Sequence, residues 1–140
     1  MYIPYGNEIL NEEDIRKIIE EKTDFKVIKD MTKGTKREDC HGFCLSVSID
    51  TLNEIMKEEY EDFDFGNIDE DELFEEYLSL SEEMALDMEE FFPEAAVIDA
   101  KAYKWDQSDN DIKLILVVVP DYVKERKIMD IMKVLLKQCE

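Results

Sequence analysis

Hydrophobic and polar positions divide the chain into segments with two different periods. Over residues 11–22 the apolar residues recur three and four positions apart, which predicts an amphipathic helix with Asn11 as its N-cap. Residues 25–31 favour a strand, and the polar residues that follow favour a loop with its turn at Gly34. Residues 43–49 alternate between apolar and polar, so they predict a strand with one buried face.

Two further helices are predicted in the middle of the chain. Thr51 and Glu54 have the spacing of a capping box, which predicts that a second helix begins there. The Gly-Asn pair at residues 66–67 interrupts that helix, and Asp69 is a suitable N-cap for a third one. Acidic residues throughout its first turn suit the helix dipole, and Pro93 ends the helix at or just before the preceding residue.

The third helix has the strongest amphipathic pattern in the chain. At about 100° per residue, one side of it is apolar and is expected to face the core. The residues of that side are Leu73, Tyr77, Leu80, Met84, Met88 and Phe91. The other side is acidic, with Leu86 as its one apolar residue. The acids there and on its flank are Asp71, Glu72, Glu75, Glu76, Glu82, Glu83, Asp87, Glu89 and Glu90.

The last third of the chain predicts a hairpin followed by a helix. Residues 97–105 and 112–119 favour strands, and the turn-forming residues between them favour a hairpin. Residues 114–119 are apolar without interruption, so we expect a central strand that is covered on both faces. A C-terminal helix is predicted to start at Pro120 and Asp121. Its inward side would carry Ile128, Ile131, Met132, Leu135 and Cys139.

These elements predict one α+β domain over residues 1–140. Their order is α-β-β-α-α-β-β-α, and the economical fold is a four-stranded, mostly antiparallel sheet with helices packed on it. A chain of 140 residues that is 44% hydrophobic is long enough to bury a core without disulfides or metals.

Negative charge is concentrated in one part of the chain. Residues 54–94 contain 18 acidic residues and one lysine, so they hold 17 of the 20 net negative charges. Because the acids alternate with apolar residues at helical spacing, this segment is expected to form a rigid acidic surface rather than a disordered tract. Such a surface disfavours nucleic acid and anionic membranes as partners and favours basic proteins.

Other features bear on the location of the protein. The first residues lack the basic start and the apolar stretch of a signal peptide, and no apolar run approaches about 20 residues. Three cysteines, an odd number, argue against a disulfide framework, so we expect a cytoplasmic protein.

Few residues suggest catalysis or metal binding. Cys40, His41 and Cys44, together with Cys139, could form a zinc site, but neighbouring residues rarely bind the same ion. Residues 61–72 match a calcium-binding loop at its glycine and final glutamate, but phenylalanines stand at two ligand positions. With one histidine and no phosphate-binding or nucleophile motif, we expect no enzyme activity, no cofactor and no specific metal.

The function expected from this sequence is binding. We expect a small acidic inhibitor that mimics nucleic acid and blocks a basic, nucleic-acid-processing protein, as phage counter-defence or immunity-type proteins do. The helix carries one acid per about 3 Å, close to the spacing of about 3.4 Å between phosphates of a DNA strand. The expected partner-binding residues are Glu61, Asp62, Asp64, Phe65, Asp71, Glu72, Glu75, Glu76, Glu82, Glu83, Asp87 and Glu90.

Two alternatives remain open from the sequence. The protein could be an acidic adaptor or chaperone for a basic protein, with aromatic residues near Phe65 sharing the contact. It could also be a metal protein or an enzyme centred on Cys40, His41 and Cys44.

Overall fold

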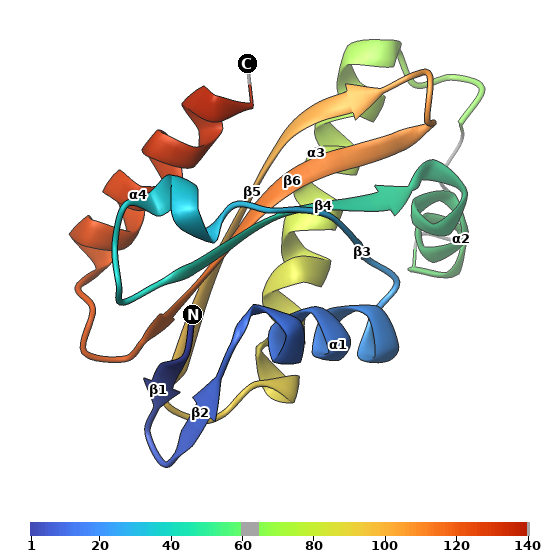
Figure 1. The fold of residues 1–140 in the computed structure, drawn as a ribbon. Coiled ribbons are helices and arrows are strands. Elements are labelled where there is room, and N and C mark those ends of the chain that lie inside the picture. Colours follow the sequence, from blue (N-terminus) through green and yellow to red (C-terminus); the bar gives the residue numbers. More distant parts are fainter. Residues whose placement is uncertain (60–64, 140) are drawn as a thin grey trace.

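The computed structural model describes residues 1–59 and 65–139, and it has the predicted α+β fold (Figure 1). Its centre is a four-stranded antiparallel sheet in the order β3-β4-β6-β5. These strands are β3 (Lys26–Asp30), β4 (His41–Ser48), β5 (Ala96–Asp106) and β6 (Asp111–Pro120). The hairpin predicted between the last two strands is confirmed, with β5 at the edge of the sheet.

Helices cover both faces of this sheet (Figure 1). One face packs against α1 (Glu12–Lys22), α2 (Ile49–Glu59) and α3 (Glu70–Asp87), and the short 3₁₀ helix η2 (Met88–Phe91) continues α3. The other face packs against α4 (Glu125–Gln138) and the 3₁₀ helix η1 (Thr32–Thr35). The core therefore has two layers, one on each side of the sheet.

The central strand β6 contributes to both layers, as its uninterrupted apolar run predicts. Leu114, Leu116 and Val118 point toward α1 and α3, whereas Ile115 and Val117 point toward α4. All of them are fully buried. At about 1.5–3 kcal/mol for each such side chain, this strand is a large part of the hydrophobic stabilisation.

The prediction of one buried face for the strand that became β4 is wrong. Phe43 and Leu45 lie in the layer beneath α1 and α3, but Cys44 and Ser46 on the opposite face are buried as well. Cysteine and serine are small enough to pack beneath covering elements, and Cys44 packs here in the layer beneath α4. In β4, the alternation of apolar and polar residues therefore separates two faces that are both buried, and not a buried face from a solvent-exposed one.

An N-terminal hairpin was not predicted. Strand β1 (Ile3–Tyr5) pairs with β2 (Glu8–Leu10) across a turn in which Gly6 has a φ of 65°. Strands of three residues are too short to show a period in the sequence. The hairpin belongs to the core nevertheless, because Ile3 and Tyr5 are buried.

Helix starts are confirmed for α1 and α3 and corrected for the other two. Asn11 and Asp69 each accept a hydrogen bond from the backbone N–H three residues later. Helix α2 begins earlier than the predicted capping box, because Ser48 Oγ accepts the N–H of Thr51 at 3.1 Å. Helix α4 begins later than predicted, because Pro120 is the last residue of β6.

The end of the third helix also differs from the prediction. The α-helix ends at Asp87 and η2 follows it, so the helical register changes before Pro93. As a result, Met88 and Phe92 are buried, whereas Phe91, which was expected in the core, is 41% exposed.

The N-cap of α1 supplies a test of the fold. In α1 the cap is reciprocal, because Asp14 Oδ2 also accepts the N–H of Asn11 at 3.0 Å. We expect Asn11→Ala to lower the free energy of unfolding by about 1 kcal/mol, since it leaves a backbone N–H of the first turn without its acceptor. Urea denaturation would measure this. Asn11→Asp retains the acceptor and should cost much less; equal losses in both variants would contradict the cap.

Candidate functional site

Helix α3 is fixed against the edge of the sheet by aromatic contacts. Trp105 of β5 packs edge-on against Tyr77 with ring centroids 5.1 Å apart, and the centroid of the Phe74 ring lies 6.2 Å from that of Trp105. The Tyr77 hydroxyl donates to Asn53 Oδ1 at 2.5 Å, which ties α3 to α2. These contacts fix the position of α3, so the residues on its outer side have a defined position as well.

That outer side carries a group of exposed carboxylates, which we call the acidic face. Its members on α3 are Asp71, Glu72, Glu75, Glu76, Glu83 and Asp87. None of them forms an ion pair with another residue in the described part of the chain. Glu90 lies just beyond, in η2, and is also exposed. The acidic face thus remains available for an external cation.

Glu82 was predicted as part of this surface, but it has a structural contact. Its Oε1 accepts the backbone N–H of Ala102 at 2.9 Å and lies 3.7 Å from Lys101 Nζ. Since β5 is an edge strand, this bond satisfies an N–H that no neighbouring strand can reach. Glu82 therefore joins α3 to the sheet edge.

The remaining predicted residues lie before α3. Glu61, Asp62 and Asp64 are outside the described residues. Phe65 is partly buried and packs against the core layer beneath α1 and α3, with Lys57 Nζ 5.9 Å from its ring centroid. Most of the Phe65 ring is therefore committed to the protein itself.

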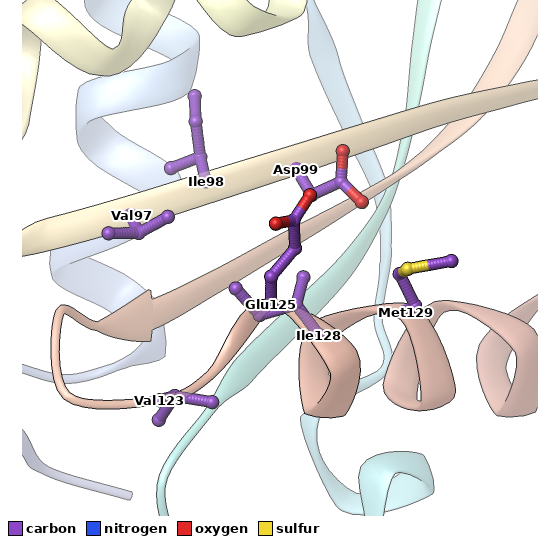
Figure 2. A pocket seen from close by; sticks show the side chains of 7 residues that line it. All are labelled: Val97, Ile98, Asp99, Val123, Glu125, Ile128 and Met129. Atoms are coloured by element: carbon purple, nitrogen blue, oxygen red, sulfur yellow. The ribbon is translucent and has the colours of Figure 1, made fainter.

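A hollow that the sequence did not predict lies between β5 and the start of α4 (Figure 2). It has a volume of about 360 Å³, and its walls are mainly apolar. Asp99 and Glu125 line it from the two elements, and both side chains reach into the space between β5 and α4 (Figure 2). Burial raises the pKa of Asp99, and the nearby carboxylates of Glu82 and Glu125 raise it further, while the Ala100 N–H and the Lys101 ammonium partly offset the rise.

The single histidine is part of a buried hydrogen-bonded group. His41 Nε2 lies 2.9 Å from the Met1 carbonyl oxygen and 3.1 Å from Glu12 Oε1, so this nitrogen carries the proton. Nδ1 then accepts the Tyr5 hydroxyl at 2.6 Å. Burial lowers the pKa of His41, while the Met1 carbonyl and Glu12 partly offset the effect. This neutral histidine holds the N-terminal hairpin and α1 against β4.

The cysteines do not combine with His41 into one site. Successive residues of a strand point to opposite faces, so His41 lies on the side of Tyr5 whereas Cys40 and Cys44 lie on the side of α4. Burial raises the pKa of both thiols. Because the thiolate is the nucleophile and the metal ligand, neither chemistry is favoured at these positions.

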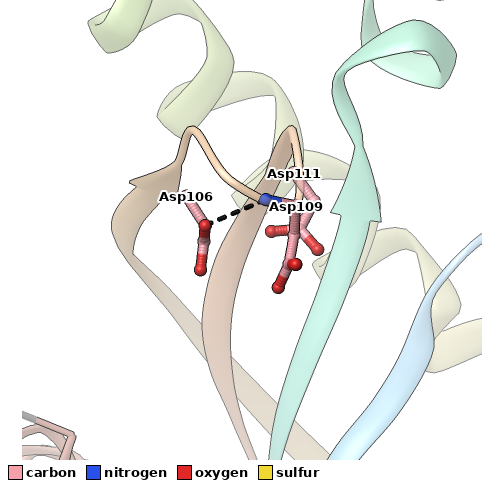
Figure 3. Close-up of side chains that lie close together, drawn as sticks. All are labelled: Asp106, Asp109 and Asp111. Atoms are coloured by element: carbon pink, nitrogen blue, oxygen red, sulfur yellow. Dashed lines mark hydrogen bonds between the residues drawn. The ribbon is translucent and has the colours of Figure 1, made fainter.

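One group of three acids in the described residues has the spacing of metal ligands. Asp106, Asp109 and Asp111 lie together at the β5–β6 turn, where Asp106 Oδ1 accepts the Asp109 N–H at 3.1 Å (Figure 3). Lys113 Nζ already lies 3.0 Å from Asp109 Oδ2 and 2.8 Å from Asp111 Oδ2. The ammonium group therefore supplies the positive charge that a metal would bring.

Comparisons with known proteins do not add an assignment. No protein family, no curated protein and no solved structure matches this chain. Within the described residues, no helix is both long enough and apolar enough to cross a membrane.

The buried histidine should make stability depend on pH. Since its pKa is lowered in the folded protein, the unfolded chain binds a proton that the folded protein excludes as the pH falls below about 6.5. We expect the free energy of unfolding to fall by at most about 1.4 kcal/mol per pH unit through this group. His41→Gln keeps a donor and an acceptor and should lack this contribution. Urea denaturation between pH 7 and pH 5 would measure the free energy of unfolding of both proteins. If that free energy changed equally with pH in wild type and in His41→Gln, His41 would not be the source of the pH dependence.

The acidic face includes a carboxylate at an unfavourable helix end. Asp87 is the last residue of α3, and no basic residue lies in that turn. Since the C-terminal end of a helix is negative, Asp87→Asn should stabilise the protein by about 0.3–1 kcal/mol, measured by thermal denaturation at low salt. Asp71→Asn, in the first turn, should destabilise it by a similar amount. If both variants shifted the melting temperature in the same direction, the cause would be the change in net charge rather than the helix dipole.

Proposed function

We propose that this protein acts by binding rather than catalysis. In this proposal the acidic face of α3 occupies the nucleic-acid groove of a basic, nucleic-acid-processing protein and inhibits it. The three free cysteines suit a reducing compartment, so we place this interaction in the cytoplasm.

The observation that carries the proposal is the set of exposed, unpaired carboxylates on one rigid helix. Helical spacing aligns four of them in a row, at Glu72, Glu76, Glu83 and Asp87. The row spans about 22 Å at 1.5 Å per residue. A groove that binds a phosphate backbone presents lysine and arginine over similar lengths, and these side chains are the complement of the acidic face.

The stability cost of this surface also supports a binding role. Closely spaced like charges repel each other, and the acids at the end of α3 oppose its dipole. A surface needed only for solubility is served as well by mixed charges, with lysines placed four residues from the glutamates. A basic partner would convert this internal repulsion into attraction.

A charge-reversal experiment tests the proposal. Lysine would replace four exposed acids of α3, Glu75, Glu76, Glu83 and Asp87. The immobilised proteins would be incubated with the heparin-binding fraction of a bacterial lysate, which is rich in nucleic-acid-binding proteins. We expect wild type to retain a partner at about 50 mM salt, in the regime where Debye screening is weak, and to release it to duplex DNA or RNA. The reversed variant should not retain it.

A matched control separates position from net charge. Lysine at the exposed residues Glu8, Glu21, Asp24 and Glu38 changes the charge by the same amount away from α3. This control should keep the partner. Retention by the α3 variant would contradict the proposal, and a partner that nucleic acid does not displace would indicate an adaptor instead of a mimic.

A further inference from the structure

The hollow between β5 and α4 combines apolar side chains with two carboxylates that form no ion pair in the described residues. Val97, Val123 and Met129 line it, together with the side chains of Asp99 from β5 and Glu125 from α4 (Figure 2). Met129 is 53% exposed, so an apolar side chain lies open at the rim. An occupant with an aliphatic stem and a cationic head would satisfy both parts of this surface.

No cation of the protein fills this role in the described residues. Neither Asp99 nor Glu125 forms an ion pair there, and the nearby ammonium of Lys101 lies against Glu82 instead. Asp99 Oδ1 accepts the N–H of Ala100 at 3.0 Å, a local bond that engages one oxygen of the carboxylate. Glu125 suits the first turn of α4. These local roles do not explain why the two carboxylates line the same hollow.

The free edge of β5 does not favour an added strand as the occupant. The backbone N–H groups of Ala100 and Ala102 donate to the carboxylates of Asp99 and Glu82, respectively. An added strand would need these same N–H groups for its own hydrogen bonds. Side chains that engage edge groups in this way hinder edge-to-edge pairing. A partner therefore meets this edge through its side chains.

We propose that the hollow receives an arginine side chain of a partner protein. Its aliphatic stem would lie against Val97, Val123 and Met129, and its guanidinium would bridge Asp99 and Glu125. A guanidinium is planar, weakly hydrated and has five N–H donors, so it can serve two carboxylates from different elements. Charge-assisted bonds of this kind gain strength where apolar walls limit water.

This site rests on the proposed basic partner. It lies on the α4 side of the sheet, whereas the acidic face lies on the α3 side, and the edge strand β5 is common to both. Asp71 and Glu75 lie on the same side of α3 as Glu82, which reaches the β5 edge at Ala102. Val97 and Asp99 of that same strand line the hollow. A basic protein lying along β5 could therefore contact the acidic face and insert one arginine beside it.

The test uses an arginine derivative, so it does not need the partner. N-acetyl-arginine amide would be titrated into ¹⁵N-labelled protein while amide shifts are followed. We expect saturable shifts confined to residues 97–99 and 123–129. The double variant Asp99→Asn, Glu125→Gln should weaken binding at least about tenfold, because both charge-assisted contacts are lost. The neutral analogue N-acetyl-citrulline amide should cause no saturable shift.

Controls separate binding from folding and from general acidity. The amide oxygen that Asp99→Asn introduces can still accept the Ala100 N–H, and removing a half-buried charge with a raised pKa should leave the fold at least as stable. Glu21→Gln with Glu89→Gln removes two exposed acids outside the hollow and should bind like wild type. Equal binding of citrulline or of the double variant, shifts spread over α3, or tighter binding of the lysine derivative would overturn the arginine site.

Failure here can be distinguished from failure of the proposed function. If the arginine derivative does not bind but wild type still retains its partner through α3, the hollow is not an arginine site and the inhibitor proposal stands. If the derivative binds in the hollow but charge reversal of α3 leaves partner retention unchanged, the arginine site stands and the acidic-face proposal fails.

Discussion

Burial of β6 on both faces is the constraint on which the rest of the fold depends. An apolar strand paired on both edges must be covered above and below, so helices are required on each face of the sheet. Helices α1 and α3 supply one cover, and α4 with η1 supplies the other. The same requirement buries Cys44 and Ser46 of β4, and it brings the start of α4 close enough to β5 to form the hollow at Asp99.

Helix α3 carries its charge because its inner side is well anchored. Tyr77 and Phe74 pack on Trp105, Leu80 and Met88 fill the core, and Glu82 holds the sheet edge. These contacts offset repulsion among the outer carboxylates, whose mutual distances the helix itself determines. An acidic loop with the same composition would relax away from such repulsion. The arrangement therefore presents negative charge in a constant geometry, which is the property that the proposed recognition of a basic groove would require.

Prediction from the sequence succeeded where a pattern was long or chemically specific. The run at residues 114–119, the caps at Asn11 and Asp69 and the amphipathic third helix were all recognisable. It failed where an element was short, or where the burial of a residue depended on another element packed over it. The hairpin of Ile3–Tyr5 and Glu8–Leu10 has too few residues to show a period, and the change from α-helix to η2 exposed Phe91.

The sequence by itself determined the composition of the acidic segment, the helical phase of α3 and the need for a doubly covered central strand, because these follow from the order of residues along one element. Only the tertiary structure decided which acids are available. It assigned Glu82 to an edge N–H, placed Asp99 opposite Glu125, which are 26 positions apart in the chain, and buried His41 between Tyr5 and Glu12. These relations join different elements, and the packing of those elements rather than local periodicity brings the side chains together.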